Sequence, residues 1–207
     1  MKRIVKEPEI RRLEIIMSAK MLFEAHGYEN TSVESIIKEA GIAKGTFYYY
    51  FKTKKDILTA LVNHIGSDLK DHFESIVALK NVKAVEKLKR MIRGEEKKHK
   101  TSPTVMALIH KPENRELQEQ LNIQSVQNIA PLIAQVIEQG NKEGVFNAKT
   151  PIESVQLLLA ASQFVLDSGL FNWPENKRVK LLKALQASFE QSIGAKSGSL
   201  GFIANEK

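Results

Sequence analysis

The sequence contains no cysteine, so disulfide bonds and thiolate metal sites are both excluded. This absence fits a reducing compartment, and we expect a cytoplasmic protein. No run of 18 or more apolar residues occurs, which predicts no membrane span and no membrane partner. The first residues, MKRIVKEPEIRRLE, are basic but lack an apolar h-region, so we expect no secretory signal.

Catalytic motifs are missing as well. The sequence has no glycine-rich phosphate loop, no zinc-protease helix pair and no nucleophile elbow. His64, Asp68 and His72 lie four residues apart on one predicted helical face, which is a possible metal-binding face. One helix supplies three ligands at best in poor geometry, and such a face is more often solvated, with His–Asp pairing. We therefore expect no enzyme, no metal site and no cofactor.

Strand signals are nearly absent. There is no Val/Ile/Thr alternation bounded by turn pairs, and neither Asn-Gly nor Asp-Gly occurs as a hairpin signal. Helical periodicity runs through almost the whole chain instead, which predicts an all-α fold. The 207 residues are 43% hydrophobic, enough to bury a sizeable core in one large domain or in a small domain joined to a larger one.

The charge of the chain is basic, with a net value of +7. A basic excess indicates a polyanionic partner, most often nucleic acid. A solvated surface that happens to be basic explains the net charge equally well, so the position of the charges decides between the two.

Helix start and stop signals divide the first third of the chain. Pro8 suits the first turn of one helix, and Gly27 supplies its left-handed stop. A second helix opens at Thr31 or Ser32, where Thr31 with Glu34 predicts a capping box. A third helix runs from Lys44 to about Phe51. Thr53, with Asp56 as its box partner, caps a long fourth helix that continues to about Leu79.

The second and third helices have the spacing of a helix-turn-helix, because a three-residue turn containing Gly41 joins them. In that motif the second helix enters the DNA major groove by its N-terminal residues. Phe47 and Phe51 lie four residues apart and are predicted to fill the core, which leaves the tyrosines of KGTFYYYF on the other face. Tyrosine rings can contact thymine methyls or sugars while their hydroxyls donate to phosphates. Gly45 lets the backbone approach the bases closely.

A tyrosine-rich core helix is the alternative, but three consecutive tyrosines cannot all face inward. Lys52, Lys54 and Lys55 gather at the start of the fourth helix. The partial positive charge and free N–H groups of a helix N-terminus favour a phosphate there.

The stretch TSVESIIKEAGIAKGTFYYYFKTKKDIL, preceded by AKMLFEAHGYEN, resembles the N-terminal DNA-binding domain of the TetR family of helix-turn-helix transcriptional regulators, over about Ile15 to Leu61. The resemblance implies base contacts from Lys44, Gly45 and Tyr48. It implies DNA backbone contacts from Ser32, Thr46, Tyr49, Tyr50 and Lys54. One position departs from the family, since Ala43 stands where a capping Ser or a similar residue is usual.

The resemblance also implies the domain organisation. Residues 1–55 form the three-helix DNA-binding domain, and residues 56–195 form a helical effector-binding and dimerisation domain. The glycine- and serine-rich residues 196–207 are predicted to be a mobile tail. Within the second domain, Pro131 predicts a kink or a break in a helix.

Dimerisation is expected to use the last two helices, Ile152–Phe171 and about Glu175–Ile193, as a four-helix bundle. The first of these is apolar nearly all round, which also suits a central helix of a monomer. Predicted interface residues are Leu158, Phe164, Leu182, Leu185 and Phe189.

An effector pocket is expected between the fourth helix and those that follow it. Methionine and phenylalanine at helical spacing are more often core residues than ligand contacts, so this set is chosen on family resemblance and side-chain type. It comprises Met91, Met106, Ile109, His110, Gln124, Asn128, Gln163, Phe164 and Asp167.

The function that the resemblance implies is a sequence-specific regulator, most often a repressor, that binds a palindromic operator as a homodimer and is released by a small-molecule effector. The alternative is a non-specific architectural DNA-binding protein. Salt-dependent binding without sequence discrimination would favour that alternative.

Overall fold

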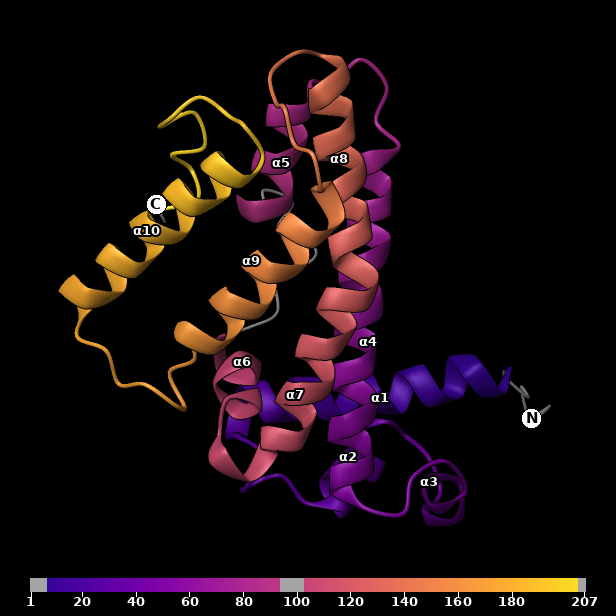
Figure 1. The fold of residues 1–207 in the computed structure, drawn as a ribbon. Coiled ribbons are helices and arrows are strands. Elements are labelled where there is room, and N and C mark those ends of the chain that lie inside the picture. Colours follow the sequence, from indigo (N-terminus) through magenta and orange to yellow (C-terminus); the bar gives the residue numbers. More distant parts are fainter. Residues whose placement is uncertain (1–6, 94–102, 205–207) are drawn as a thin grey trace. The chain divides into compact units, whose positions relative to one another are not determined.

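The computed structural model of the chain describes residues 7–93 and 103–204 (Figure 1), and within these ranges it contains helices and no strand. The predicted all-α class is confirmed. In chain order the elements are α1 (Pro8–His26), α2 (Val33–Glu39), α3 (Lys44–Tyr50), α4 (Lys54–Val77), α5 (Ala84–Arg93), α6 (Pro103–Ile109), the 3-10 turn η2 (Pro112–Asn114), α7 (Arg115–Gln124), the π-helical segment η3 (Ser125–Ile129), α8 (Ala130–Lys142), α9 (Pro151–Val165) and α10 (Glu175–Ser192). No helix in the described ranges is long and apolar enough to cross a membrane.

The described residues divide into two compact units. The first lies within residues 1–65 and 101–117, and the second within residues 66–100 and 118–207. The predicted domain boundary at residue 55 therefore differs from the observed division, which falls inside α4 and assigns α6 to the first unit. The reason is packing, because α6 lies against α1 within the first unit.

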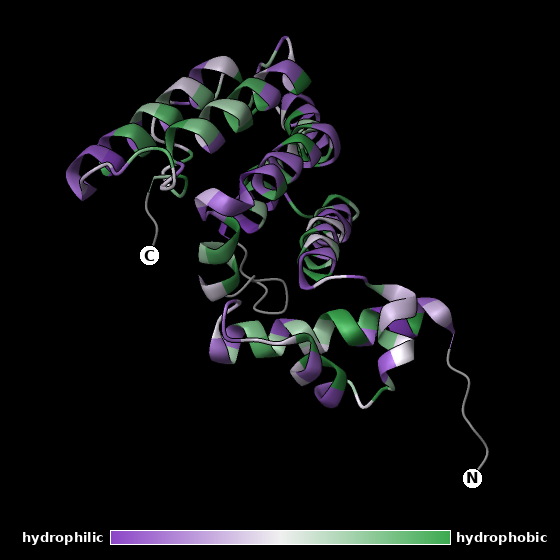
Figure 2. Cartoon of the chain, turned by 90° about the horizontal axis from the view of Figure 1, so that it is seen from below, coloured by the Kyte–Doolittle hydropathy of each residue, from purple (hydrophilic) through white to green (hydrophobic). Residues whose placement is uncertain are grey.

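The first unit is built on buried side chains of α1 to α4. Phe23, Ile36, Phe47 and Leu61 are almost completely removed from solvent. Each comes from a different helix, so all four helices contribute buried side chains to the first unit. Figure 2 shows hydrophobic and hydrophilic residues interleaved along the helices, as expected where each helix has one buried face.

The second unit has its own core. Helix α8 packs against α5 and α9, and α10 packs against α9. The break predicted at Pro131 takes the form of η3, where the N–H of Ala130 donates to the carbonyl of Ser125, five residues earlier. Since Pro131 has no N–H and its ring crowds the carbonyl four residues before it, a widened turn ahead of it relieves the conflict.

The C-terminal segment is packed rather than free. Leu200 is fully buried in the core of the second unit, and Phe202 and Ile203 pack against that core. The carboxylate of Glu190 accepts hydrogen bonds from the N–H groups of Gly198 and Leu200, both at 2.8 Å. The prediction of a mobile tail is thus wrong for residues 196–204, because the apolar side chains in this glycine-rich stretch have a core to enter. Residues 205–207 lie outside the described ranges.

Candidate nucleic-acid interface

Helix α3 is divided into a buried and an exposed side. Phe47 is fully buried and Phe51, just past its end, is 3% exposed, whereas Tyr48 is 46% exposed and Tyr49 is 78% exposed. Tyr50 is half-buried, and its ring lies edge-on to that of Tyr49 at 4.9 Å. The predicted assignment of the phenylalanines to the core is confirmed.

The first turn of α3 presents little bulk and one positive charge. Lys44 and Gly45 are exposed, and the Lys44 ammonium lies 6.0 Å from the centre of the Tyr48 ring. Thr46 is half-buried, and its N–H donates to the carbonyl of Ala43 at 2.9 Å. Ala43 is the N-cap and provides no side-chain cap, as its methyl group predicts. A groove of bases and phosphates can accept such a surface of aromatic rings, hydroxyls and an ammonium.

The N-terminus of α2 is capped differently from the prediction. Ser32 is the N-cap, its hydroxyl accepts from the N–H of Ser35 at 3.0 Å, and the Ser35 hydroxyl accepts from the N–H of Ser32 at 3.1 Å. The predicted Thr31–Glu34 box is therefore wrong. Thr31 is buried, and its hydroxyl donates to the carbonyl of Gly27 at 2.8 Å. Ser32 is exposed at the N-terminus of α2, so it is accessible for the predicted contact with the DNA backbone.

The start of α4 has the predicted capping box. The N–H of Asp56 donates to the Thr53 hydroxyl at 3.1 Å, and one Asp56 oxygen accepts from the N–H groups of Lys52 and Thr53. Desolvation tends to raise the pKa of Asp56, but the hydrogen bonds from Thr53 and Lys52, together with the charge of Lys52, leave the pKa below its ordinary value. Lys52 and Lys55 are exposed, and Lys55 lies 3.6 Å from Glu116.

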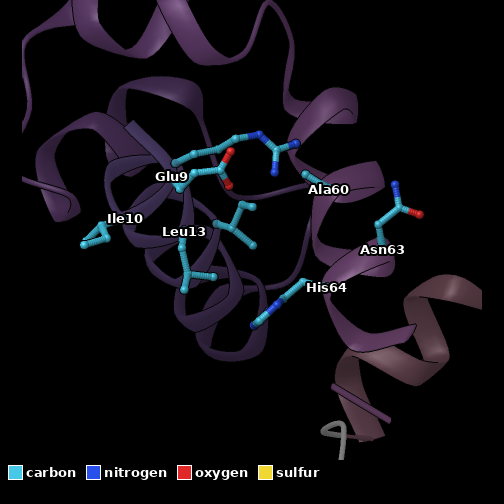
Figure 3. A pocket seen from close by; sticks show the side chains of 8 residues that line it. Glu9, Ile10, Leu13, Ala60, Asn63 and His64 are labelled. Carbon is cyan, nitrogen blue, oxygen red and sulfur yellow. The ribbon is translucent and has the colours of Figure 1, made fainter. Parts of the chain in front are cut away.

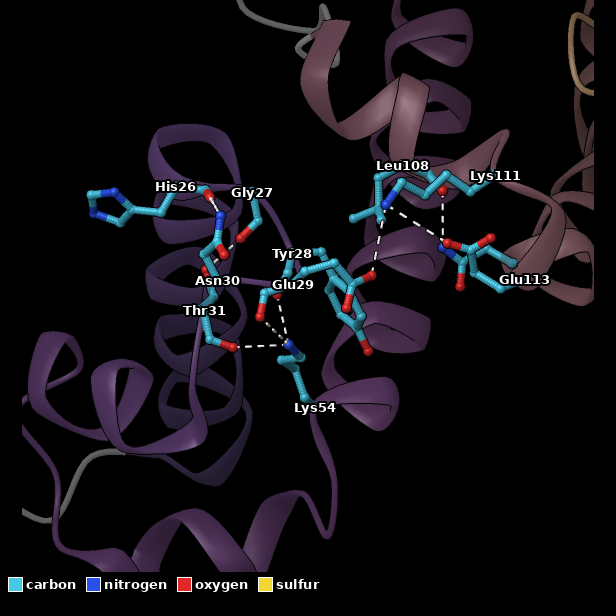
Figure 4. A network of polar contacts seen from close by, with 11 residues as sticks. His26, Gly27, Tyr28, Glu29, Asn30, Thr31, Lys54, Leu108, Lys111 and Glu113 are labelled. Carbon is cyan, nitrogen blue, oxygen red and sulfur yellow. Dashed lines mark hydrogen bonds and ion pairs between the residues drawn. The ribbon is translucent and has the colours of Figure 1, made fainter.

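The Lys54 side chain makes contacts within the protein that the sequence analysis did not predict. Its ammonium nitrogen is 2.6 Å from the carbonyl oxygen of Tyr28 and 2.9 Å from that of Thr31 (Figure 4). The side chain therefore reaches back to the turn between α1 and α2. The sequence carried no signal for this contact, because the partners are 23 and 26 residues away.

The predicted effector residues are divided between the two units. Met106, Ile109 and His110 belong to the first unit and the other six to the second. Met91 and Ile109 are buried, whereas Met106 and Phe164 are exposed. These assignments stay predictions.

Asp167 is the best-defined polar member of that set. It is buried, and its carboxylate accepts from the side-chain amide of Gln118 and from the N–H of Gly169, both at 2.8 Å.

A pocket of about 410 Å³ lies between α1 and α4 in the first unit. Figure 3 shows Glu9, Ile10 and Leu13 on one side of it and Ala60, Asn63 and His64 on the other. None of the predicted effector residues lines this pocket, so sequence reasoning missed it.

The possible metal face of α4 is not assembled as one surface. His72 is buried in the second unit, whereas Asp68 is exposed. Across the described ranges, no three His, Asp or Glu side chains are grouped as ligands of a metal ion.

The predicted dimer residues fall into two groups. Phe189 is buried in the core of its own protomer, so its assignment to the interface is wrong. Leu158, Leu182 and Leu185 are half-buried. Phe164 is 56% exposed.

Helix α9 also carries an exposed apolar stripe at helical spacing. Leu157, which the prediction omitted, is 73% exposed and begins it. The other members are Ala160, Ala161 and Phe164.

Comparison with known families gives two matches. Residues 15–61 match the family described as bacterial regulatory proteins, tetR family, and residues 100–188 match a tetracyclin repressor-like C-terminal domain. Among curated proteins, the fatty acid metabolism regulator protein of Bacillus subtilis is 40% identical over 57 residues, which are 28% of this chain and 29% of that protein. The uncharacterised regulator YuxN of the same organism is 46% identical over 50 residues, 24% of this chain and 17% of that protein. The chain thus covers less than a third of the length of these relatives.

Solved structures resemble the chain over nearly all of its length. RolR in complex with resorcinol has a TM-score of 0.59 at 18% identity, covering 97% of this chain and 95% of that one. Salmonella enterica GusR has a TM-score of 0.62 at 21% identity, covering 93% of this chain and all of that one. SmeT, the repressor of a Stenotrophomonas maltophilia multidrug efflux pump, has a TM-score of 0.57 at 18% identity, covering 91% of this chain and 92% of that one. At these identities the similarity establishes the fold.

Proposed function

This chain belongs to the TetR family of bacterial regulatory proteins, and from that premise we propose that it binds a palindromic DNA operator as a homodimer and represses transcription until an effector releases it. Membership in a family of transcriptional regulators also identifies it as a DNA-binding protein and not an enzyme. Family membership alone does not establish the palindromic operator, the homodimer or the release by an effector, so these are the parts that we propose.

One observation carries the operator proposal. Helix α3 buries Phe47 and exposes Tyr48 and Tyr49 beside Lys44 and Gly45. Exposed aromatic side chains cost solubility unless a partner covers them, and the major groove offers thymine methyls and phosphates to such a surface. The base-contact and phosphate-contact roles of individual residues are part of the proposal.

The dimer is supported by α9. A stripe that begins with Leu157 and ends with Phe164 is apolar, exposed and one helix face wide. Most soluble oligomers are symmetric, and a twofold dimer presents two recognition helices to a palindromic site. Packing of two α9–α10 pairs would bury the stripe.

Release by a small molecule is supported by the fold shared with RolR, which was solved with resorcinol bound. An effector that binds better to a dimer with mismatched recognition helices shifts the population away from the DNA-bound form. The proposal names no effector for this chain.

The test is selection of binding sites from random DNA duplexes by the purified protein. The proposal predicts enrichment of one palindromic sequence with half-sites about one helical turn apart. A non-specific architectural protein would enrich no sequence and would bind all duplexes with the same salt dependence. In a reporter fused to the selected site, the repressor proposal predicts lower expression when the protein is present.

A further inference from the structure

The turn Gly27–Thr31 between α1 and α2 ends a helix and leaves backbone carbonyl groups to be satisfied. A helix C-terminus carries a partial negative charge, because its last carbonyl groups have no partner within the helix. Three carbonyl groups find donors within the segment itself, and one of them is that of Tyr28, which accepts from the N–H of Thr31 at 3.2 Å. The Asn30 amide donates to His26 at 3.0 Å, and the Thr31 hydroxyl donates to Gly27 at 2.8 Å.

Three carbonyl groups of the turn, those of Tyr28, Glu29 and Thr31, converge on Lys54. The ammonium nitrogen lies 2.6 Å from the oxygen of Tyr28, 2.9 Å from that of Thr31 and 3.5 Å from that of Glu29. It also lies 4.2 Å from the centre of the Tyr28 ring, within cation–π distance. An ammonium group has three hydrogens to donate, so these carbonyl groups account for all of them.

The turn is joined to the core on its other side. The Tyr28 ring lies edge-on to the buried Phe23 at 5.1 Å. Lys111 approaches the Glu29 carboxylate at 3.7 Å, but both side chains are exposed and such a pair contributes little. Figure 4 shows both lysines directed at the turn. Lys54 therefore provides the stronger tie.

We propose that Lys54 is a positioning residue of the DNA-binding surface, which ties the turn Gly27–Thr31 to the start of α4 and so fixes the place of Ser32. Ser32 follows Thr31 directly and is the N-cap of α2. A shift of the turn would move the N-terminus of α2 relative to the start of α4, and both are predicted to contact phosphates. The effect of Lys54 on operator binding rests on the proposed function. The contacts between Lys54 and the turn do not, because they are present in the protein without DNA.

Amine labelling of the free protein tests the tie without DNA. Acetylation with a limiting amount of an activated ester, followed by mass spectrometry, gives the relative rate at each lysine. Lys54 is expected to react at least about tenfold more slowly than the exposed Lys52, because its hydrogen bonds must break first. Equal rates at Lys54 and Lys52 in the free protein would overturn the proposal.

Variants test the positioning role on the selected operator. Lys54→Met is expected to lower the melting temperature and, in folded protein at 15 °C, to weaken operator binding by about tenfold, with an unchanged slope of log affinity against log salt. A residue that only stabilises the fold would leave the affinity of the folded protein unaltered. Lys54→Arg is expected to rescue neither property, because a planar guanidinium does not match carbonyl groups that converge on one point. Lys52→Met is the control and should keep the parent's melting temperature.

A phosphate contact gives the opposite results. Each neutralised phosphate contributes about 0.9 to the salt slope, so loss of one contact in each subunit of a dimer lowers it by about 1.8. That decrease in Lys54→Met, with an unchanged melting temperature and full rescue by arginine, would overturn the positioning role. If the parent protein selects no operator, the proposed function fails, while the labelling rates and melting temperatures still decide whether the tie exists.

Discussion

The structure leaves room for a side chain at Gly45 of α3. A Cβ atom built on it meets no atom within 4 Å, and Gly45 stands in the first turn of the helix. Gly45→Ala should therefore stabilise the protein by up to about 1 kcal/mol, since alanine is the better helix former. Operator binding should nevertheless weaken, because the added methyl would project where the bases approach. Unfolding curves and operator titrations measure the two effects. An alanine variant that binds the operator as well as the parent would mean that the backbone does not come close to DNA here.

Ala43, which directly precedes the first turn of α3, is a second position where a substitution should stabilise the protein. It is the N-cap of α3, in extended conformation and with no side-chain cap. Ala43→Ser would supply an acceptor for an unsatisfied N–H of the first helical turn, so the free energy of unfolding should rise by about 1 kcal/mol. Urea denaturation checks this. No change would show that α3 is already held by its neighbours.

Residue-level prediction succeeded where spacing decides and failed where tertiary contact decides. Phe47 and Phe51 are four residues apart, and that spacing alone places both on the core side. The partners of Lys54 and the exposure of Leu157 depend on which segments of the chain lie next to them. A single sequence carries no signal for either.

Among the elements, helix ends were the easiest feature to predict from sequence. Pro8, Gly27 and the Thr53–Asp56 pair mark boundaries that the structure reproduces, because each acts through its own backbone chemistry. The cap of α2 was assigned one residue too early, since Thr31 and Ser32 have nearly the same capping ability. Thr31 is buried and Ser32 is therefore the N-cap, and burial depends on tertiary packing that the local sequence does not show.

The C-terminal segment after α10 gives a pH prediction at this scale. Burial tends to raise the pKa of Glu190. Hydrogen bonds from Gly198, Leu200 and Gln186 lower the pKa by more than burial raises it, so the pKa lies below its ordinary value. The folded pKa lies below the unfolded one, so the stabilisation is present near neutral pH and is lost as the pH falls through the folded pKa. Glu190→Gln should cost about 1–3 kcal/mol at pH 7 and progressively less in acid.

Urea unfolding at a series of pH values measures this difference. Glu138→Gln is the control, since Glu138 is exposed on α8. If the gap between the parent and Glu190→Gln stays constant down to pH 3, the carboxylate does not hold the segment.

At the scale of the whole molecule, the exposed apolar stripe of α9 is the basis for expecting a homodimer. Leu157 is 73% exposed in the protomer, so Leu157→Lys should leave the protomer folded. In a dimer it would bury an unpaired charge, which costs several kcal/mol. Sedimentation should therefore show a monomer, and operator affinity should fall with it.

Ile92→Lys serves as the matched control, since Ile92 is an exposed apolar residue of α5. Loss of dimer in both variants would point to a general effect of charge. A dimer in both would place the interface elsewhere.

The claim that α3 reads base sequence is tested most directly by Tyr48→Ala. Tyr48 is 46% exposed and lies beside the buried Phe47, so its removal should leave the fold intact. The measurement is the affinity of parent and variant for the selected operator and for a scrambled duplex at one salt concentration. A base contact discriminates by about 1–3 kcal/mol, so the operator preference should fall at least about tenfold while binding to the scrambled duplex hardly changes. An equal loss on both duplexes would contradict the base-reading role and leave Tyr48 as a contact to the DNA backbone.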